Sequence, residues 1–433
     1  MKRSLLQQTV HTLFSILAGQ GAMIAAGIAI SRVYGPVGKG VVSYAGIGII
    51  AAVSIGEGFS LAISRIVGAE PERVAVAYAA ARRIVIIISA LIVPPIALIG
   101  ILVPSQHALI AVAIAWPFAL YLQTMNGFHL IALRVERTNY ASLATNAGTG
   151  VAILLAIASR HVDIWGILAI WVAGYAVGAA LTARGIHQLA RAVRSEEVRA
   201  MLAELFRFGR LSSLASLATY FSVRIDVFIV SAMLSAVSLG NYTLAIAVGE
   251  LMWQVSRAIS WSSYGRIATA SFADGAAIAA RVSRLVIALE IVSAAIAFTV
   301  GPWLVTLVYG AAFAAARVPL RILLPGMAVY AADSILSYFL SVRANRPGLI
   351  VRIELITLSV CAIVTFATIG RFGIAGAAIA TTVAYAISFG AKATFFVRLT
   401  GLSPWDLLVV RRGDFDAFRG TGRTNEPVVA PAP

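Results

Sequence analysis

Two charged residues stand inside an apolar stretch of the sequence. Arg224 and Asp226 lie in a segment that runs from about residue 211 to residue 237 and is otherwise largely apolar. This length suits a helix that crosses a bilayer, which needs about 20 apolar residues. A charge near the centre of such a helix costs about 2.5–3.5 kcal/mol on insertion scales, so both residues are candidates for function. Because they are two positions apart on a helix, they point to different sides and need separate partners.

A second set of polar and aromatic residues follows at helical spacing. Glu250, Trp253, Arg257, Trp261 and Tyr264 are separated by three or four positions, which places them on one face of a helix. Aromatic rings stack on sugar faces and a guanidinium binds phosphate oxygens through two N–H groups, so this face could bind a sugar–phosphate. The tryptophans could equally pack between helices or lie at the membrane surface. We predict that Arg224 and the arginine and tryptophans of this face bind substrate.

Further charged residues fall in apolar segments. Arg32 lies at the end of the first such segment, where it could bind phosphate or extend to the lipid headgroups. Glu57 in the second segment and Asp333 in the tenth are acids inside the membrane, as are Asp226 and Glu250. We predict that these four acids are candidates for coupling transport to H⁺ or Na⁺. A hydrogen bond within the helix bundle would explain each of them as well.

Composition identifies the class of protein. The chain has 433 residues, of which 60% are hydrophobic and 12% charged, whereas soluble proteins carry about 25% charged residues. Long apolar runs recur along most of the chain, so we predict an all-α polytopic membrane protein. The net charge of +16 comes from Lys and Arg that mostly flank apolar runs. We assign it to topology and to anionic membrane lipids, with no nucleic-acid partner.

Cofactor chemistry has no support in the sequence. The single cysteine, Cys361, excludes an intramolecular disulfide and a multi-cysteine metal site. The five histidines are scattered without metal-ligand spacing, and no phosphate-binding loop of ATP-driven proteins is present. We therefore predict no metal, no cofactor and no catalytic residue.

The apolar runs predict twelve transmembrane helices. Most of the 34 Lys and Arg residues fall on one side when the segments alternate with the N-terminus inside, so both termini are predicted to be cytoplasmic. The N-terminal apolar run is too long for a signal peptide and is expected to remain as the first helix. The predicted helices span residues 10–33, 41–67, 75–103, 108–133, 140–159, 164–189, 209–236, 240–267, 283–308, 318–342, 349–369 and 373–398.

Weak internal matches divide the chain into two halves. At an offset of about 200 residues, Ser31 and Gly40 fall on Ser231 and Gly240, and other ordered matches follow. We predict two six-helix lobes related by a parallel repeat, with the substrate site between them. The predicted parts are an N-lobe (1–190), a cytoplasmic linker (191–207), a C-lobe (208–402) and a disordered cytoplasmic tail (403–433).

Three stretches of the sequence carry a resemblance to a known family. They are Ser31–Gly40; Arg224 and Asp226 with Leu239–Ala245 and Glu250; and Tyr309–Phe313 through Pro319–Gly326, with Gly373–Ala380 beyond. No single motif is specific, but the order and spacing of the three stretches make the match. On these residues the chain resembles the polysaccharide (O-antigen type) flippases of the multidrug/oligosaccharidyl-lipid/polysaccharide exporter superfamily.

The resemblance implies a function and its partners. Such a flippase moves an undecaprenyl-pyrophosphate-linked oligosaccharide from the inner to the outer leaflet of the cytoplasmic (inner) membrane by alternating access, for cell-surface polysaccharide synthesis. It implies twelve helices in two six-helix lobes with a cationic cavity, and Arg224, Asp226 and Glu250 match the family's seventh and eighth helices by position. A glycan polymerase or glycosyltransferases could contact such a protein.

Three other functions remain as alternatives. A multidrug exporter of the same fold, coupled to Na⁺ or H⁺, would use the acids within the helices. A membrane polymerase or glycosyltransferase is disfavoured because the predicted outer loops are short. A sugar permease of the major facilitator type shares the helix number, but its charged loop between the second and third helices is missing. We predict that the protein is not an enzyme.

Overall fold

The protein consists of helices joined by short connections in the part of the chain that its computed structural model describes, which is residues 5–131, 135–189, 193–411 and 414. A chain buried in lipid must satisfy its backbone N–H and C=O groups internally, and helices do so within one segment. The helices are α1 (Leu5–Ala69), α2 (Val74–Leu102), α3 (Ala108–Ile131), α4 (Val135–Leu143), α5 (Thr149–Ala158), α6 (Ile164–Ile186), α7 (Ser195–Ser222), α8 (Ile225–Met233), α9 (Ala236–Glu250), α10 (Trp253–Thr269), α11 (Phe272–Tyr309), α12 (Arg317–Tyr330), α13 (Asp333–Tyr338), α14 (Pro347–Phe372), α15 (Ile374–Thr400) and α16 (Trp405–Leu408).

Many of these helices are long and apolar enough to cross a membrane. In the described residues nine helices meet this test, or ten when α7 and α8, bent by 55° at a short break, count as one crossing. Exposed leucine, isoleucine and valine side chains along them would face lipid. The protein is therefore a multi-pass membrane protein, as the composition predicts.

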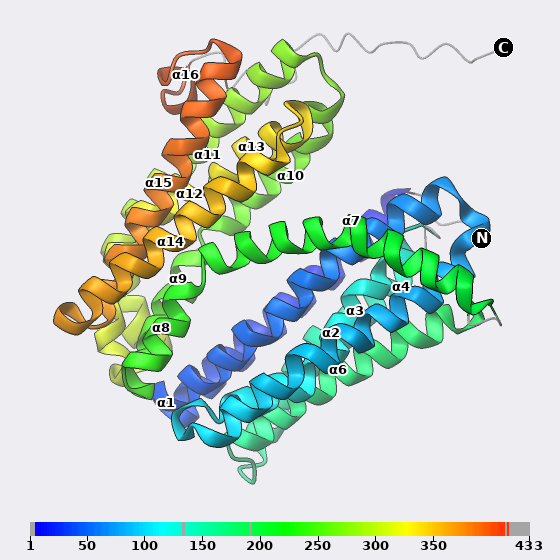
Figure 1. Ribbon diagram of the computed structural model, residues 1–433. Helices are drawn as coiled ribbons and strands as arrows, with labels where there is room; N and C mark the ends of the chain where they lie inside the picture. Colours follow the sequence, from blue (N-terminus) through cyan, green and yellow to red (C-terminus); the bar gives the residue numbers. More distant parts are fainter. Residues whose placement is uncertain (1–4, 132–134, 190–192, 412–413, 415–433) are drawn as a thin grey trace.

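The helices lie in two groups that α7 joins (Figure 1). The first group consists of α1–α6 and the second of α8–α15. Helix α7 packs on α1 and α2 of the first group and on α14 of the second. It begins at Ser195, so most of the predicted linker is helical rather than an open loop. In the predicted tail, the short helix α16 packs on α11, and the residues after 414 lie outside the described chain.

Helix α1 contains a sharp bend. Gly35 has φ 63° and ψ −163°, inside a run of 65 residues that would be about 100 Å long if it were straight. The positive φ favours glycine, and Pro36 follows it. The bend separates the residues predicted as the first two helices, so the chain turns where the sequence indicates.

The two groups touch near this bend through their backbones. A Cβ atom added to Gly240 of α9 would lie 1.8 Å from the Pro36 carbonyl oxygen, and one added to Gly40 would lie 2.8 Å from the Ala236 oxygen. Polar contacts lie at the same end of the helices. Arg32 donates from Nε to the Val308 oxygen at 2.6 Å, and Gln106 donates from Nε2 to the Ser231 oxygen at 3.2 Å.

Replacing Gly240 with alanine is expected to disrupt this contact. The added methyl group cannot fit beside the Pro36 oxygen, and overpacking of this kind costs about 1–3 kcal/mol. We expect a lower melting temperature in detergent, or a shift toward a form in which α1 and α9 are separated. Gly265→Ala in α10 is the matched control, because its added Cβ would meet no atom within 4 Å. If the Gly240→Ala protein has the same melting temperature as the control and keeps the α1–α9 distance, this prediction is wrong.

Candidate functional site

Arg224 forms an ion pair at a place where two helices are interrupted. Its Nη2 lies 2.5 Å from Oε1 of Glu250, and the side chains are 16% and 21% exposed. Arg224 lies between the end of α7 and the start of α8, and Glu250 is the last residue of α9. Continuous helices were predicted over both regions, and the structure corrects this with breaks after Ser222 and Glu250. Interrupted backbone inside a membrane is tolerated where protein or water satisfies its polar groups, which is typical of binding sites.

The ion pair lies close to the junction of the two helix groups. Tyr220, one turn before Arg224, donates its hydroxyl to the Ile47 carbonyl oxygen of α1 at 2.5 Å. Phe221 and Phe228 on either side of the break are packed together, with ring centres 5.6 Å apart. The Arg224 guanidinium is thus partly exposed beside aromatic residues, with a carboxylate as its partner.

Asp226 has different partners from Arg224, as predicted, although a helix break rather than the helical angle separates the two residues. Its carboxylate accepts hydrogen bonds from Thr381 Oγ1 at 2.6 Å, from the Val227 N–H at 2.8 Å and from the Tyr242 hydroxyl. The residue is 0% exposed, enclosed by α8, α9 and α15. A fully buried carboxylate held by three donors can retain its charge or take up a proton when its surroundings change.

Asp333 belongs to a buried charge cluster, which we define as Asp333, Glu354 and Lys392. Lys392 Nζ lies 2.5 Å from Asp333 Oδ2 and 2.6 Å from Glu354 Oε1, and all three residues are buried. Ser388 donates to Asp333 at 2.9 Å, and Ser222 donates to Glu354 at 2.6 Å. The cluster joins the end of α7 to α13, α14 and α15.

This cluster does not balance its own charges. With both carboxylates ionised, one lysine faces two acids, which leaves an excess negative charge in the membrane interior. Burying such a charge is costly, so a proton or a second cation is favoured there. In the described residues, no three His, Cys, Asp or Glu side chains could hold a metal ion, and the cluster has only two carboxylates.

The sequence prediction missed two of the three cluster residues. Lys392 lies near the end of the last predicted helix, where a positive charge normally marks the membrane surface, but the structure buries it completely in α15. Glu354 lies in α14 among apolar residues. A lysine and a glutamate within apolar runs were themselves a signal, because such residues are rare in membrane spans unless they have partners.

The aromatic face of α10 is only partly available to a substrate. Trp253 is buried and donates from Nε1 to the Met327 oxygen at 2.9 Å, so it packs between helices. Arg257 is exposed, with its guanidinium carbon 5.6 Å from the centre of the Trp253 ring. The side chain of Trp261 lies outside the described part of the structure.

Two other predicted residues are separate from these clusters. Glu57 of α1 is exposed. Arg32 binds the Leu307 and Val308 carbonyl oxygens in the last turn of α11, so its guanidinium links the two helix groups. The helix predicted over 318–342 is also interrupted, and this corrects the prediction: α12 ends at Tyr330 and α13 begins at Asp333.

Solved structures of similar fold are those of membrane transporters. An inward-facing multidrug resistance MATE family transporter of the MOP superfamily aligns with a TM-score of 0.70 and 15% identity, over 92% of this chain and 99% of the other. The lipid II flippase MurJ in an inward closed conformation aligns with a TM-score of 0.69 and 14% identity, over 93% and 89%. An outward-facing multidrug resistance MATE family transporter aligns with a TM-score of 0.62 and 14% identity, over 92% of this chain and 96% of the other. At these identities, the similarity shows the fold.

Sequence comparison identifies the family. No curated protein sequence matches the chain. The profile of the polysaccharide biosynthesis protein family matches residues 5–255, which is more than half of the chain and includes Arg224, Asp226 and Glu250. The resemblance found in the sequence is thereby confirmed, and the chain belongs to the polysaccharide biosynthesis protein family.

Proposed function

We propose that the protein is a flippase for a lipid-pyrophosphate-linked oligosaccharide, of the undecaprenyl type. The observation that carries the proposal is the Arg224–Glu250 ion pair, which is partly exposed at two helix breaks beside the junction of the helix groups. Membership of the polysaccharide biosynthesis protein family supports the cargo class, and the similarity to the lipid II flippase MurJ supports the movement of a lipid-linked saccharide.

The proposal includes the topology predicted from the sequence. Helix α1 would cross the inner membrane twice, before and after Gly35, and α9 with α10 would form one interrupted crossing. Twelve crossings then divide into two lobes, residues 1–190 and 208–402, related by a parallel repeat. Both termini would be cytoplasmic, which the distribution of Lys and Arg favours.

In this mechanism Arg224 exchanges one anion for another. Glu250 holds the guanidinium while no cargo is present, because an unpaired charge in the membrane is costly. An arriving pyrophosphate offers more acceptor oxygens and a larger charge, so it can replace the carboxylate. Arg257 and Arg32 are further candidates for this cargo, and Trp261 remains a candidate for the sugar. The lipid tail would remain in the bilayer throughout.

Alternating access would use the contact between the helix groups. The Gly40–Gly240 contact and the Arg32–α11 hydrogen bonds join the groups at the end of the bundle where α1 bends at Gly35. Under the proposed topology this end is extracytoplasmic, so the structure would correspond to an inward-facing form. The higher TM-score against the inward-facing MATE transporter than against the outward-facing one, 0.70 against 0.62, supports this state.

Buried acids could couple this movement to an ion gradient. Asp226 lies two residues after Arg224. Ser222 lies two residues before Arg224 and donates a hydrogen bond to Glu354 of the buried charge cluster. A proton or Na⁺ taken up by Asp226 or by Asp333 and its neighbours would change the packing around the α7–α8 break. Glu57 and Glu250 are the remaining candidates for this coupling.

A second candidate function is a multidrug exporter coupled to Na⁺ or H⁺. The specific observation in its favour is the 0.70 TM-score against a multidrug resistance MATE family transporter. Such an exporter would use Glu250 and Glu57 for cationic compounds. Glu250, however, is already paired with a cation, which favours an anionic cargo.

Transport by purified protein tests the two functions. In liposomes with a lipid-pyrophosphate-linked oligosaccharide on one leaflet, we expect the protein to expose the glycan to a glycosidase added on the other side, with a pH or Na⁺ gradient altering the rate. Heat-inactivated protein is the control. Efflux of a cationic dye without any movement of the glycan lipid would instead support the exporter.

A further inference from the structure

A carboxylate from the C-terminal segment is bound by arginines of α11. Asp414 is 2% exposed, and its oxygens accept hydrogen bonds from Arg284 Nε at 2.8 Å and Arg284 Nη2 at 2.6 Å. Arg281 Nε lies 3.3 Å from the same carboxylate, and the Arg411 N–H donates to it at 2.8 Å. Arg284 is itself buried, at 6% exposed. Two-point binding by a buried guanidinium is the geometry that also suits a phosphate.

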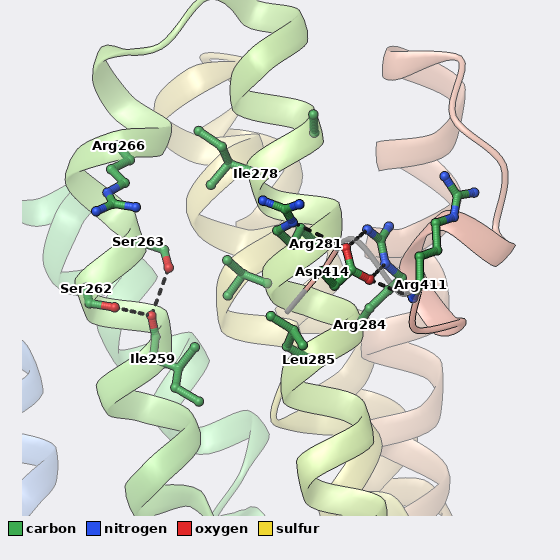
Figure 2. Close-up of a pocket in the computed structure, with 12 residues that line it drawn as sticks. Ile259, Ser262, Ser263, Arg266, Ile278, Arg281, Arg284, Leu285, Arg411 and Asp414 are labelled. Carbon is green, nitrogen blue, oxygen red and sulfur yellow. Dashed lines mark hydrogen bonds and ion pairs between the residues drawn. The ribbon is translucent and has the colours of Figure 1, made fainter. Parts of the chain in front are cut away.

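These arginines line a cavity between α10, α11 and the C-terminal segment (Figure 2). Its volume is about 860 Å³, within the range of ligand sites in proteins. Four arginines and one acid line it, so positive charge is in excess: Arg266, Arg281, Arg284 and Arg411, with Asp414. Figure 2 shows Arg266 on α10 and Arg281 with Arg284 on α11.

The walls of this cavity also identify the kind of ligand. Apolar side chains of Ile259, Ile278 and Leu285 line it beside the arginines. A small hydrophilic anion needs only the charged part, whereas a phosphate attached to an acyl or prenyl chain would use both. The cavity lies next to helices that would be surrounded by lipid, which gives such a molecule a route of access.

We propose that this cavity binds a phosphate-bearing headgroup, and that Asp414 occupies part of the site as an internal competitor. Removing the carboxylate frees the two-point donor of Arg284 for the headgroup. The proposal does not depend on which cargo the protein moves, because the cavity involves neither Arg224 nor the buried charge cluster. It assigns Asp414 the role of a displaceable ligand of Arg284.

Protonation would not release Asp414 from Arg284 near neutral pH. The pKa of Asp414 is lowered from 3.8 to about 2, mainly by the hydrogen bonds from Arg284. The Arg411 N–H and the nearby positive charges lower it further. The contact is therefore fully present above about pH 4 and is lost only as the pH falls toward 2. Displacement near neutral pH requires a competing anion.

Binding measurements on the full-length protein in detergent test the proposal. The probes are dioctanoyl phosphatidic acid, inorganic phosphate and, as the neutral-headgroup reference, dioctanoyl phosphatidylcholine, with binding followed by native mass spectrometry. We expect Asp414→Asn to raise the affinity for phosphatidic acid about tenfold, as for removal of one competing charged contact. Arg266→Gln is expected to lower it. Glu72→Gln and Arg352→Gln, exposed residues outside the cavity, are the charge-matched controls.

The outcomes separate the sources of the phosphate. Preference for phosphatidic acid that inorganic phosphate cannot displace supports a lipid headgroup, whereas equal binding of inorganic phosphate supports a soluble phosphate compound. If Asp414→Asn and Arg266→Gln bind both probes like their controls, the proposal is overturned. Should Asp414→Asn fail to fold, Arg266→Gln decides alone, because its exposed side chain can be changed without disturbing the core.

Discussion

Lys392→Met should lower the stability of the protein by about 3–5 kcal/mol, because it leaves two buried carboxylates without their cation. Lys392 is 0% exposed and lies within 2.6 Å of both Asp333 and Glu354. Methionine has a similar length but offers no charge, so the change in packing is small. The expected result is a large drop in the melting temperature of the purified protein in detergent, with reduced yield from membranes.

Neutralising the whole cluster provides the control for this prediction. A protein with Lys392→Met, Asp333→Asn and Glu354→Gln carries no buried charge at this place, so it should recover much of the lost stability. Arg352→Gln, an exposed change on the same helix as Glu354, should leave the melting temperature nearly unchanged. If the Lys392→Met protein has the same melting temperature as the unchanged protein, the three charges do not depend on one another.

Arg224→Ala should reduce glycan-lipid transport about ten- to a hundredfold, the effect of losing one hydrogen-bonded charge at a binding site. Folding should suffer less than with Lys392, because Arg224 and Glu250 are 16% and 21% exposed and water can reach the remaining carboxylate. The liposome assay with glycan lipid measures the rate, and the amount of protein in the membrane is checked in parallel.

Two variants make this second prediction specific. Arg224→Lys keeps the charge but loses the planar pair of donors, so it should retain an intermediate rate. Arg257→Ala removes an exposed arginine on the neighbouring helix and should have a smaller effect, because Arg257 lies over Trp253 rather than at a helix break. Undiminished transport by Arg224→Ala, inserted in normal amount, would remove this residue from the mechanism.

Local patterns in the sequence predicted a large part of the fold. Apolar runs and positive charges at their ends predicted a helical multi-pass membrane protein, and Gly35 followed by Pro36 marks the turn between the first two segments. Separate partners were predicted for Arg224 and Asp226, and the structure gives Glu250 to the first and Tyr242 with Thr381 to the second. The assumed helical angle is not the reason, because the helix is broken between Ser222 and Ile225. These predictions depend on spacing over a few residues, which the sequence displays directly.

Features that depend on distant parts of the chain could not be predicted in this way. The breaks in the seventh, eighth and tenth predicted helices contain no proline at the point of interruption, so no local signal marks them. Lys392 meets Asp333 and Glu354 only after α13, α14 and α15 have packed together. Trp253 shows the same limit, since its spacing fits an open aromatic face while its partner, Met327, lies on α12.

The contact between Gly40 and Gly240 determines what must be overcome when the two helix groups separate. Two glycines carry no side chains that interdigitate, so at this point separation exposes only peptide groups to water. The contacts that must then break are those of the side chains nearby: Arg32 on α11, Gln106 on Ser231, and the Tyr44 and Phe228 rings, whose centres are 5.5 Å apart. The two helix groups can therefore rotate about the Gly40–Gly240 contact once the side-chain contacts beside it have broken.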